Sequence, residues 1–206
     1  MRKSIKYFLW IAVALIVAYN SVYFKKLSDL NTGAPKPFDA AAYANNYFYK
    51  QLPVMVSKAP DIDKLIAMIK TDTAATFKTY GHALAIGATR YFLIQGKGTI
   101  VNIDDNGVWV STASGNSVLL ATEYVYGNAL RDASGLVDIN KFSSTMDLNN
   151  IAAEIDKIVR TKILPAVKPG LKKGNMIQFT GAVGLNQVHL QLGDLEITPI
   201  SLKIIH

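Results

Sequence analysis

The sequence predicts an α+β fold with a mostly antiparallel sheet, N-terminal helices and one N-terminal transmembrane helix. Before residue 90, apolar residues recur at helical spacing. After residue 90, the chain contains stretches of β-forming residues that are separated by turn signals. A last helical stretch then precedes two further strand-like stretches at the C-terminus. This order favours a small five-stranded barrel of the oligonucleotide/oligosaccharide-binding (OB) type. An open sheet covered by helices is the alternative architecture.

The first element expected is an uncharged apolar segment at residues 7–24. As a helix it would be about 27 Å long, close to the bilayer hydrocarbon core of about 30 Å. Residues 1–27 therefore read as a membrane anchor, and the basic residues before the segment favour a cytoplasmic N-terminus. A cleaved signal segment and a buried core helix are the alternatives. The anchor or the signal would place the rest of the chain outside the cytoplasm.

A polar, Pro- and Gly-containing linker is expected at residues 28–37, followed by a single α+β domain at 38–206. A helix is predicted over 39–57, because Asp39 can cap it and apolar residues recur at helical spacing. Pro53 should kink or divide this helix. A second helix starts near Asp61 and a short third covers 72–79.

The strands of the predicted meander follow at residues 90–104, 108–113 and 117–125. Gly96 and Gly98 suggest a bulge or bend in the first strand. Asn106-Gly107 is a strong signal for a two-residue hairpin, since both residue types tolerate positive φ.

The C-terminal part is predicted to hold a connection at 127–135 and a short strand near 137–142. The clearest helix follows at 146–164, with Ser144 at its start and Pro165 at its end. In this helix Asp156 and Arg160 can pair one turn apart. Two strands, 175–183 and 195–205, close the chain.

The charge of the chain argues against a nucleic-acid partner. The formal net charge is +7, but five of the 22 basic residues flank the first apolar segment. From residue 28 onward 17 basic residues face 15 acidic ones, and a nucleic-acid-binding domain usually keeps a basic surface of its own. The chain has no cysteine, which excludes disulfides, thiolate metal sites, a cysteine nucleophile and lipid attachment at a cysteine.

Several stretches together resemble a known family, the predicted periplasmic lipoproteins grouped as domain of unknown function 2291. They are FDAAAYA at 38–44, RYFLIQGKGTIV at 90–101, YGNALRDASGLVDINKF at 126–142 and NNIAAEIDKIV at 149–159. The resemblance implies an envelope location, frequent neighbourhood to sugar-uptake genes and no assigned activity. The chain departs from the family pattern in lacking the lipidation cysteine, so an apolar anchor would replace the lipid.

The candidate ligand-binding residues are Asn128, Arg131 and Asp132, the densest polar cluster in an otherwise apolar region. Arg131 offers a planar fork of donors that Asp132 could orient, and Asn128 can both donate and accept. Such a set suits a carboxylate, a phosphate or sugar hydroxyls. In the alternative interpretation Arg131 and Asp132 pair internally and only hold the connection in place. The sequence predicts no catalytic, cofactor-binding or metal-binding residues.

These observations predict a non-enzymatic accessory or solute-binding module in the periplasm, held by a single pass in the bacterial inner membrane. The resemblance adds a link to sugar uptake. The expected partners are the membrane, through residues 7–24, and a small solute or a transport-system protein. The alternative is a structural or assembly protein of the envelope that acts through protein contacts.

Overall fold

The computed structural model describes residues 3–21 and 38–205, which fall into two compact units divided between Phe38 and Asp39. The first unit contains helix α1 (Lys3–Ser21). The predicted linker at 28–37 lies outside the described residues.

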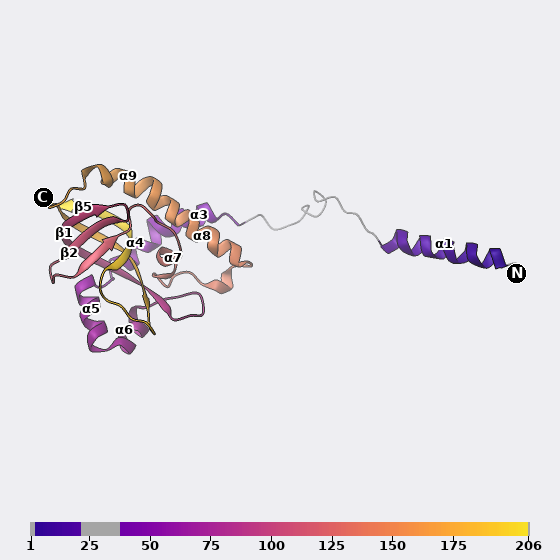
Figure 1. The fold of residues 1–206 in the computed structure, drawn as a ribbon, viewed down its shortest axis with the longest axis horizontal. Helices are drawn as coiled ribbons and strands as arrows, with labels where there is room; N and C mark the ends of the chain where they lie inside the picture. Colours follow the sequence, from indigo (N-terminus) through magenta and orange to yellow (C-terminus); the bar gives the residue numbers. More distant parts are fainter. Residues whose placement is uncertain (1–2, 22–37, 206) are drawn as a thin grey trace. The chain divides into compact units, whose positions relative to one another are not determined.

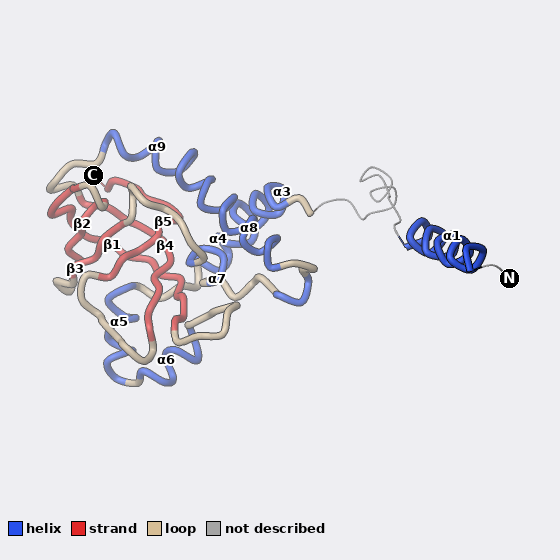
Figure 2. The backbone as a smooth tube through the Cα atoms, turned by 45° about the vertical axis from the view of Figure 1, so that its right-hand side comes forward, coloured by secondary structure: helices blue, strands red, loops and turns tan. Residues whose placement is uncertain are grey.

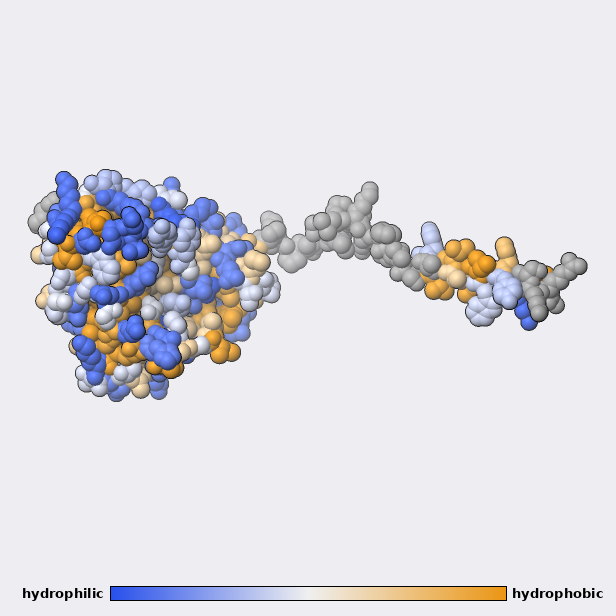
Figure 3. Space-filling view, in the orientation of Figure 1, coloured by the Kyte–Doolittle hydropathy of each residue, from blue (hydrophilic) through white to orange (hydrophobic). Residues whose placement is uncertain are grey.

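The predicted membrane-spanning helix is not found. Within the described ranges, no helix combines the length and hydropathy needed to cross a membrane. Helix α1 begins at Lys3 and includes Lys6, so its uncharged part covers only residues 7–21, about 22 Å at 1.5 Å per residue. Residues 22–24 of the predicted span are not described. In Figure 3 the visible face of α1 is mainly hydrophobic, whereas hydrophilic and hydrophobic residues are interspersed on the domain.

The second unit is built on five strands whose neighbours run β1-β2-β3-β5-β4, with β4 pairing back to β1 to close the sheet (Figures 1 and 2). All pairs are antiparallel except the parallel pair of β3 and β5. The strands are β1 (Thr89–Asp104), β2 (Gly107–Thr112), β3 (Ser117–Leu120), β4 (Met176–Asn186) and β5 (Leu195–Ile205). The predicted α+β class with a five-stranded, mostly antiparallel sheet is confirmed.

Strand β1 is long enough to pair with β4 along its first part and with β2 along its second. The bulge or bend expected at Gly96 and Gly98 lies elsewhere in the strand. Pairing with β4 is continuous through both glycines, and the register with β2 shifts between Ile100 and Asn102. Gly98 is needed for a different reason. A Cβ there would lie 2.4 Å from the Ser111 carbonyl oxygen on β2, so the two strands approach closely only without a side chain.

The predicted hairpin between β1 and β2 is present, but its turn lies one residue earlier than expected. Asp105 and Asn106 form the two-residue turn, Asn106 has no positive φ, and Gly107 already pairs with Asp104 as the first residue of β2. The Asp104 carboxylate accepts the Asn106 N–H at 2.8 Å and the Gly107 N–H at 3.3 Å, and Gly107 has a φ of +149°. The expected extension of β3 to residue 125 is wrong, since the strand ends at Leu120. The predicted strand near 137–142 is also wrong. A 3₁₀ turn, η2 (Ile139–Lys141), replaces it, because the Asp138 side chain accepts the Asn140 N–H and stabilises a turn.

Two long helical segments each contain a π-helical turn just before a proline. The segment predicted at 39–57 is continuous, and the Leu52 N–H bonds to the Tyr47 carbonyl five residues back, next to Pro53. The second long segment continues past Pro165, which was expected to end it, after a similar turn. A π turn moves the local hydrogen bonds by one residue and so accommodates the missing proline N–H. The pieces are α3 (Ala40–Asn46), η1 (Tyr47–Gln51), α4 (Leu52–Val56), α8 (Thr145–Ile158), η3 (Val159–Ile163), α9 (Leu164–Val167) and the 3₁₀ turn η4 (Lys168–Gly170).

Helices cover two sides of the closed sheet. Helices α5 (Ile62–Thr71) and α6 (Thr73–Tyr80) lie below it in Figures 1 and 2, while α8 and α9 run along its upper side with α3 beside α8. The caps predicted at Asp39 and Ser144 are present, because each side chain accepts a backbone N–H of the following turn. Asp61, predicted only as the approximate start of its helix, caps α5 in the same way. One continuous apolar core joins sheet and helices. Its largest fully buried side chains include Tyr47, Phe92, Phe179, Leu65 and Ile151.

Candidate functional site

The connection at 127–135 carries the candidate residues and contains one short helix, α7 (Ala129–Asp132). It starts and ends at glycines with positive φ, +106° at Gly127 and +66° at Gly135, where most other residues would be strained. The π turn η1, which follows α3, holds this connection through Tyr47. The Tyr47 hydroxyl hydrogen-bonds the Leu130 carbonyl at 2.7 Å and the Ser134 hydroxyl at 2.8 Å, and burial raises the pKa of Tyr47.

The side chains of Arg131 and Asp132 are both buried and paired with each other. The Arg131 Nε donates to Asp132 Oδ1 at 2.6 Å, and the two side chains are 5% and 2% exposed. The guanidinium also donates to the Leu148 carbonyl of α8 at 2.9 Å, and the Leu84 N–H donates to Asp132 Oδ2 at 3.4 Å. These contacts agree with the alternative in which Arg131 and Asp132 pair internally and hold the connection in place. A ligand role for the pair stays a prediction.

Asn128, the third candidate, lines a solvent-open cleft of about 290 Å³. The cleft lies between the segment 126–128 and one face of α8 and its π turn. Five residues at helical spacing form that face: Asn149, Ala152, Ala153, Asp156 and Arg160. We refer to this depression as the α8 cleft. Because Ala152 and Ala153 have short side chains, a solute in the cleft can approach the backbone of α8.

Asp156 is the most unusual group of the α8 cleft. It is only 3% exposed, and burial raises its pKa to about 7, against the influence of Arg160, Arg131 and the Gly127 N–H, which lower it. Within residues 3–21 and 38–205 it forms no ion pair of 4.0 Å or less. A carboxyl of this kind is protonated about half the time near neutral pH, so it can donate as well as accept a hydrogen bond.

Arg160 does not pair directly with Asp156, contrary to the prediction from their spacing. Its guanidinium donates to the Val125 carbonyl and lies 4.5 Å from the centroid of the Tyr126 ring, a cation–π contact. Tyr126 is 69% exposed and therefore offers its ring at the rim of the cleft. Arg160 holds the loop and its aromatic side chain against the helix.

Sequence reasoning found Asn128 but missed the part that α8 plays. The missed signal was the position of Asp156, which lies among Ala152, Ile155 and Val159 on the apolar face of the helix. A carboxylate on that face is buried when the helix packs on the core. The i,i+4 pairing rule describes exposed side chains, so it does not predict the contacts of a buried Asp156.

The α8 cleft offers hydrogen-bond groups of both kinds. The side-chain amides of Asn128 and Asn149 make no hydrogen bond to any residue in the described part of the chain. Together with Asp156 they present donors and acceptors to a polar solute. Among the described residues, no group of three or more His, Asp or Glu side chains is arranged to hold a metal ion.

Comparison with known proteins gives the family and the fold. The family described as "Predicted periplasmic lipoprotein (DUF2291)" matches residues 12–203, so the chain belongs to that family and the recognition from the sequence motifs is confirmed. This description supports a periplasmic location, but it names no activity and does not support a role in sugar uptake. No curated protein matches the chain.

Among solved structures, the chain is similar to an OB-fold protein from Thermotoga maritima. The two are 23% identical and superpose with a TM-score of 0.72 over 82% of this chain and 100% of that chain. At this identity the likeness establishes the fold alone. Neither the family nor the structural relative indicates an enzyme.

Proposed function

We propose that this member of the predicted periplasmic lipoprotein family is a non-enzymatic solute-binding module whose site is the α8 cleft. The observation that carries the proposal is Asp156, a buried carboxyl without a close ion pair in the wall of a solvent-open depression. Burying an ionisable group costs stability, and a purely structural position would gain by holding an apolar residue or a paired charge. Such groups cluster at functional sites.

The solute class follows from the groups that the cleft presents. Asn128 and Asn149 each offer both a donor and an acceptor, and Asp156 can do the same near neutral pH. These are the partners that hydroxyl groups need, since each hydroxyl both donates and accepts. The exposed ring of Tyr126 can pack against a flat apolar face. The volume of about 290 Å³ is at the lower end for ligand pockets, which favours a monosaccharide-sized, hydroxyl-rich solute.

The test is a thermal-shift and calorimetric screen of the full chain against D-glucose, D-galactose, D-ribose and D-xylose. A ligand of the native state raises Tm by mass action. Asn149→Ala should abolish the shift, whereas the neighbouring Asn150→Ala should keep it, because Asn150 is exposed on the same helix and does not line the cleft.

A shift that disappears in Asn149→Ala and in Asp156→Asn, with both variants folded, would support the proposal. The absence of any shift with all four sugars, or an equal loss in Asn149→Ala and Asn150→Ala, would contradict it. A positive result would also supply the first support for a link to sugar uptake.

One observation favours the second candidate, an envelope assembly protein that acts through protein contacts. Tyr124 and Tyr126 are both exposed, at 67% and 69%, on either side of the buried Val125. Exposed aromatic side chains are enriched in protein interfaces. If the sugars fail to bind and Tyr124→Ser prevents crosslinking to a membrane-fraction protein, this candidate replaces the first.

We further propose that residues 7–24 hold the domain at a membrane. The described part of this segment has exposed apolar side chains, among them Phe8 and Trp10. Aromatic rings of this kind prefer the membrane–water interface. Replacing Phe8 and Trp10 by serine should move the chain from the membrane fraction to the soluble fraction, and an unchanged distribution would contradict the proposal.

A further inference from the structure

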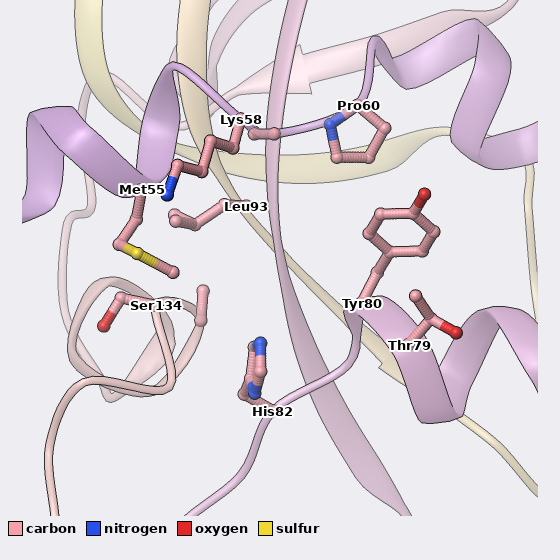
Figure 4. Close-up of a pocket in the computed structure, with 10 residues that line it drawn as sticks. Met55, Lys58, Pro60, Thr79, Tyr80, His82, Leu93 and Ser134 are labelled. Carbon is pink, nitrogen blue, oxygen red and sulfur yellow. The ribbon is translucent and has the colours of Figure 1, made fainter.

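A second depression also includes residues of the 127–135 connection, Ala133 and Ser134, and shares no residue with the α8 cleft. It has a volume of about 190 Å³, and four segments line it: the end of α4 with the residues after it, the end of α6, strand β1 and the residues after α7. The lining residues are Met55, Lys58, Ala59, Pro60, Thr79, Tyr80, His82, Leu93, Ala133 and Ser134. Figure 4 draws these residues around one open space, which we call the His82 pocket.

Two contacts position His82, one through its backbone and one through its ring. Its backbone forms a two-way bridge with Tyr91 on β1, with N–O distances of 2.9 and 2.8 Å. Its ring packs directly on Gly135, where a Cβ would lie 2.7 Å from the His82 Nδ1. In Figure 4 one of the ring nitrogens is directed toward the open space.

The ring nitrogens of His82 are available to a ligand. Within the described residues they make no hydrogen bond, and partial burial lowers the pKa of the imidazole. The ring is therefore neutral near pH 7, with one nitrogen that donates and one that accepts.

The charge of the His82 pocket is positive. No acidic residue lines it, and Lys58 forms no ion pair with any residue of the described ranges. A lysine without a counter-ion at the edge of a small depression attracts an anion. Lys58 is an exposed residue in the short turn between α4 and α5, where its backbone N–H donates to the Met55 carbonyl at 3.1 Å.

The remaining surface of the pocket is mostly apolar, from Met55, Ala59, Leu93 and Ala133, with the Tyr80 ring on one side. Small ligand sites commonly combine such an apolar lining with a few fixed polar groups. The apolar lining can contact the apolar part of a ligand, and Lys58 and His82 can bind a charged group of the same ligand.

We propose that the His82 pocket binds a small organic carboxylate, with its carboxylate on Lys58 and His82 and its apolar body against Leu93 and the Tyr80 ring. This site is independent of the α8 cleft, and the proposal does not rest on sugar binding. A phosphate ester or a larger anion fits less well, because the volume is small and the lining offers one cation only.

The test uses benzoate as the probe and benzamide as its uncharged match, each titrated into the full chain by isothermal calorimetry. Benzoate should bind and benzamide should bind at least about tenfold more weakly, because a charge-assisted hydrogen bond is about twice as strong as a neutral one. Lys58→Gln should weaken benzoate binding by a similar factor. Lys64→Gln, another exposed lysine that does not line the pocket, should leave it unchanged.

His82→Gln is the second variant, since glutamine keeps a donor but loses the ring. It should weaken benzoate binding while leaving the sugar titrations of the α8 cleft unaffected. The proposal is overturned if benzoate does not bind, if benzamide binds equally well, or if Lys58→Gln and Lys64→Gln have the same effect. A failure of sugar binding alone would leave the benzoate result as it stands.

Discussion

Replacing Asp156 by asparagine should remove a large part of the pH dependence of stability. Asparagine has the same shape and can still accept the Gly127 N–H, but it carries no proton to titrate. In the folded chain burial raises the pKa of Asp156 from 3.8 to about 7. Arg160 and Arg131 are the nearby cations, and they reduce this rise without cancelling it.

The direction in which stability changes with pH follows from the linkage between folding and proton binding. Between pH 3.8 and about 7 the folded chain binds a proton at Asp156 that the unfolded chain has released, so stability falls as pH rises through this window. The difference of about three pH units, at about 1.36 kcal/mol each, corresponds to about 4 kcal/mol in total. Between pH 5 and pH 8, where the unfolded chain is already ionised, about 3 kcal/mol of this loss should be seen.

The assay is urea unfolding of the wild type and Asp156→Asn at pH 5, 6, 7 and 8, extrapolated linearly to zero denaturant. The free energies of unfolding should differ most at pH 8, with the variant more stable, and converge toward pH 5. Glu154→Gln on the same helix is the control, since the ion pair of Glu154 with Lys157 is largely exposed and contributes little. Parallel curves for the wild type and Asp156→Asn would refute a buried, protonated Asp156.

Three further changes test the local structure by urea unfolding. Tyr47→Phe removes the hydroxyl that anchors the 127–135 connection and should lower the free energy of unfolding by about 1–3 kcal/mol; an unchanged value would mean that the hydrogen bonds add nothing net. Gly107→Ala should destabilise more than Gly115→Ala, because both have positive φ but only the first would bring a Cβ within 2.2 Å of a backbone oxygen; equal losses would contradict this. Arg131→Met leaves Asp132 buried without its partner and should cost about 3–5 kcal/mol; a loss below about 1 kcal/mol would argue that the pair is not structural.

The features that sequence predicted well are those decided by a few neighbouring residues. Asp39, Asp61 and Ser144 cap helices because each side chain reaches a backbone N–H only two or three positions away. The signal Asn106-Gly107 predicts the hairpin between β1 and β2, and the turn itself differs by one residue, since it is formed by Asp105 and Asn106. Local chemistry of this kind can be read without knowing the rest of the fold.

The features that were missed depend on contacts between distant parts of the chain. Residues 137–142 contain apolar residues typical of a strand, but no neighbouring strand is available there and Asp138 favours a turn. Pro165 breaks an isolated helix, yet in the folded chain the helix continues because a π turn precedes the proline. The environment of Asp156 is set by the segment 126–128, far away in sequence, so its burial could not be deduced from spacing alone.

The closure of the sheet also has a consequence for the order in which the chain can fold during synthesis. Strand β1 finds its second neighbour in β4, and β3 finds its second neighbour in β5, the last of these five strands to leave the ribosome. Until its partner emerges, each of these strands has unpaired backbone groups that can pair with another chain. A chain cut before Leu195 lacks β5 and would keep the open edges of β3 and β4 permanently, so premature termination should yield aggregates and not a smaller folded protein.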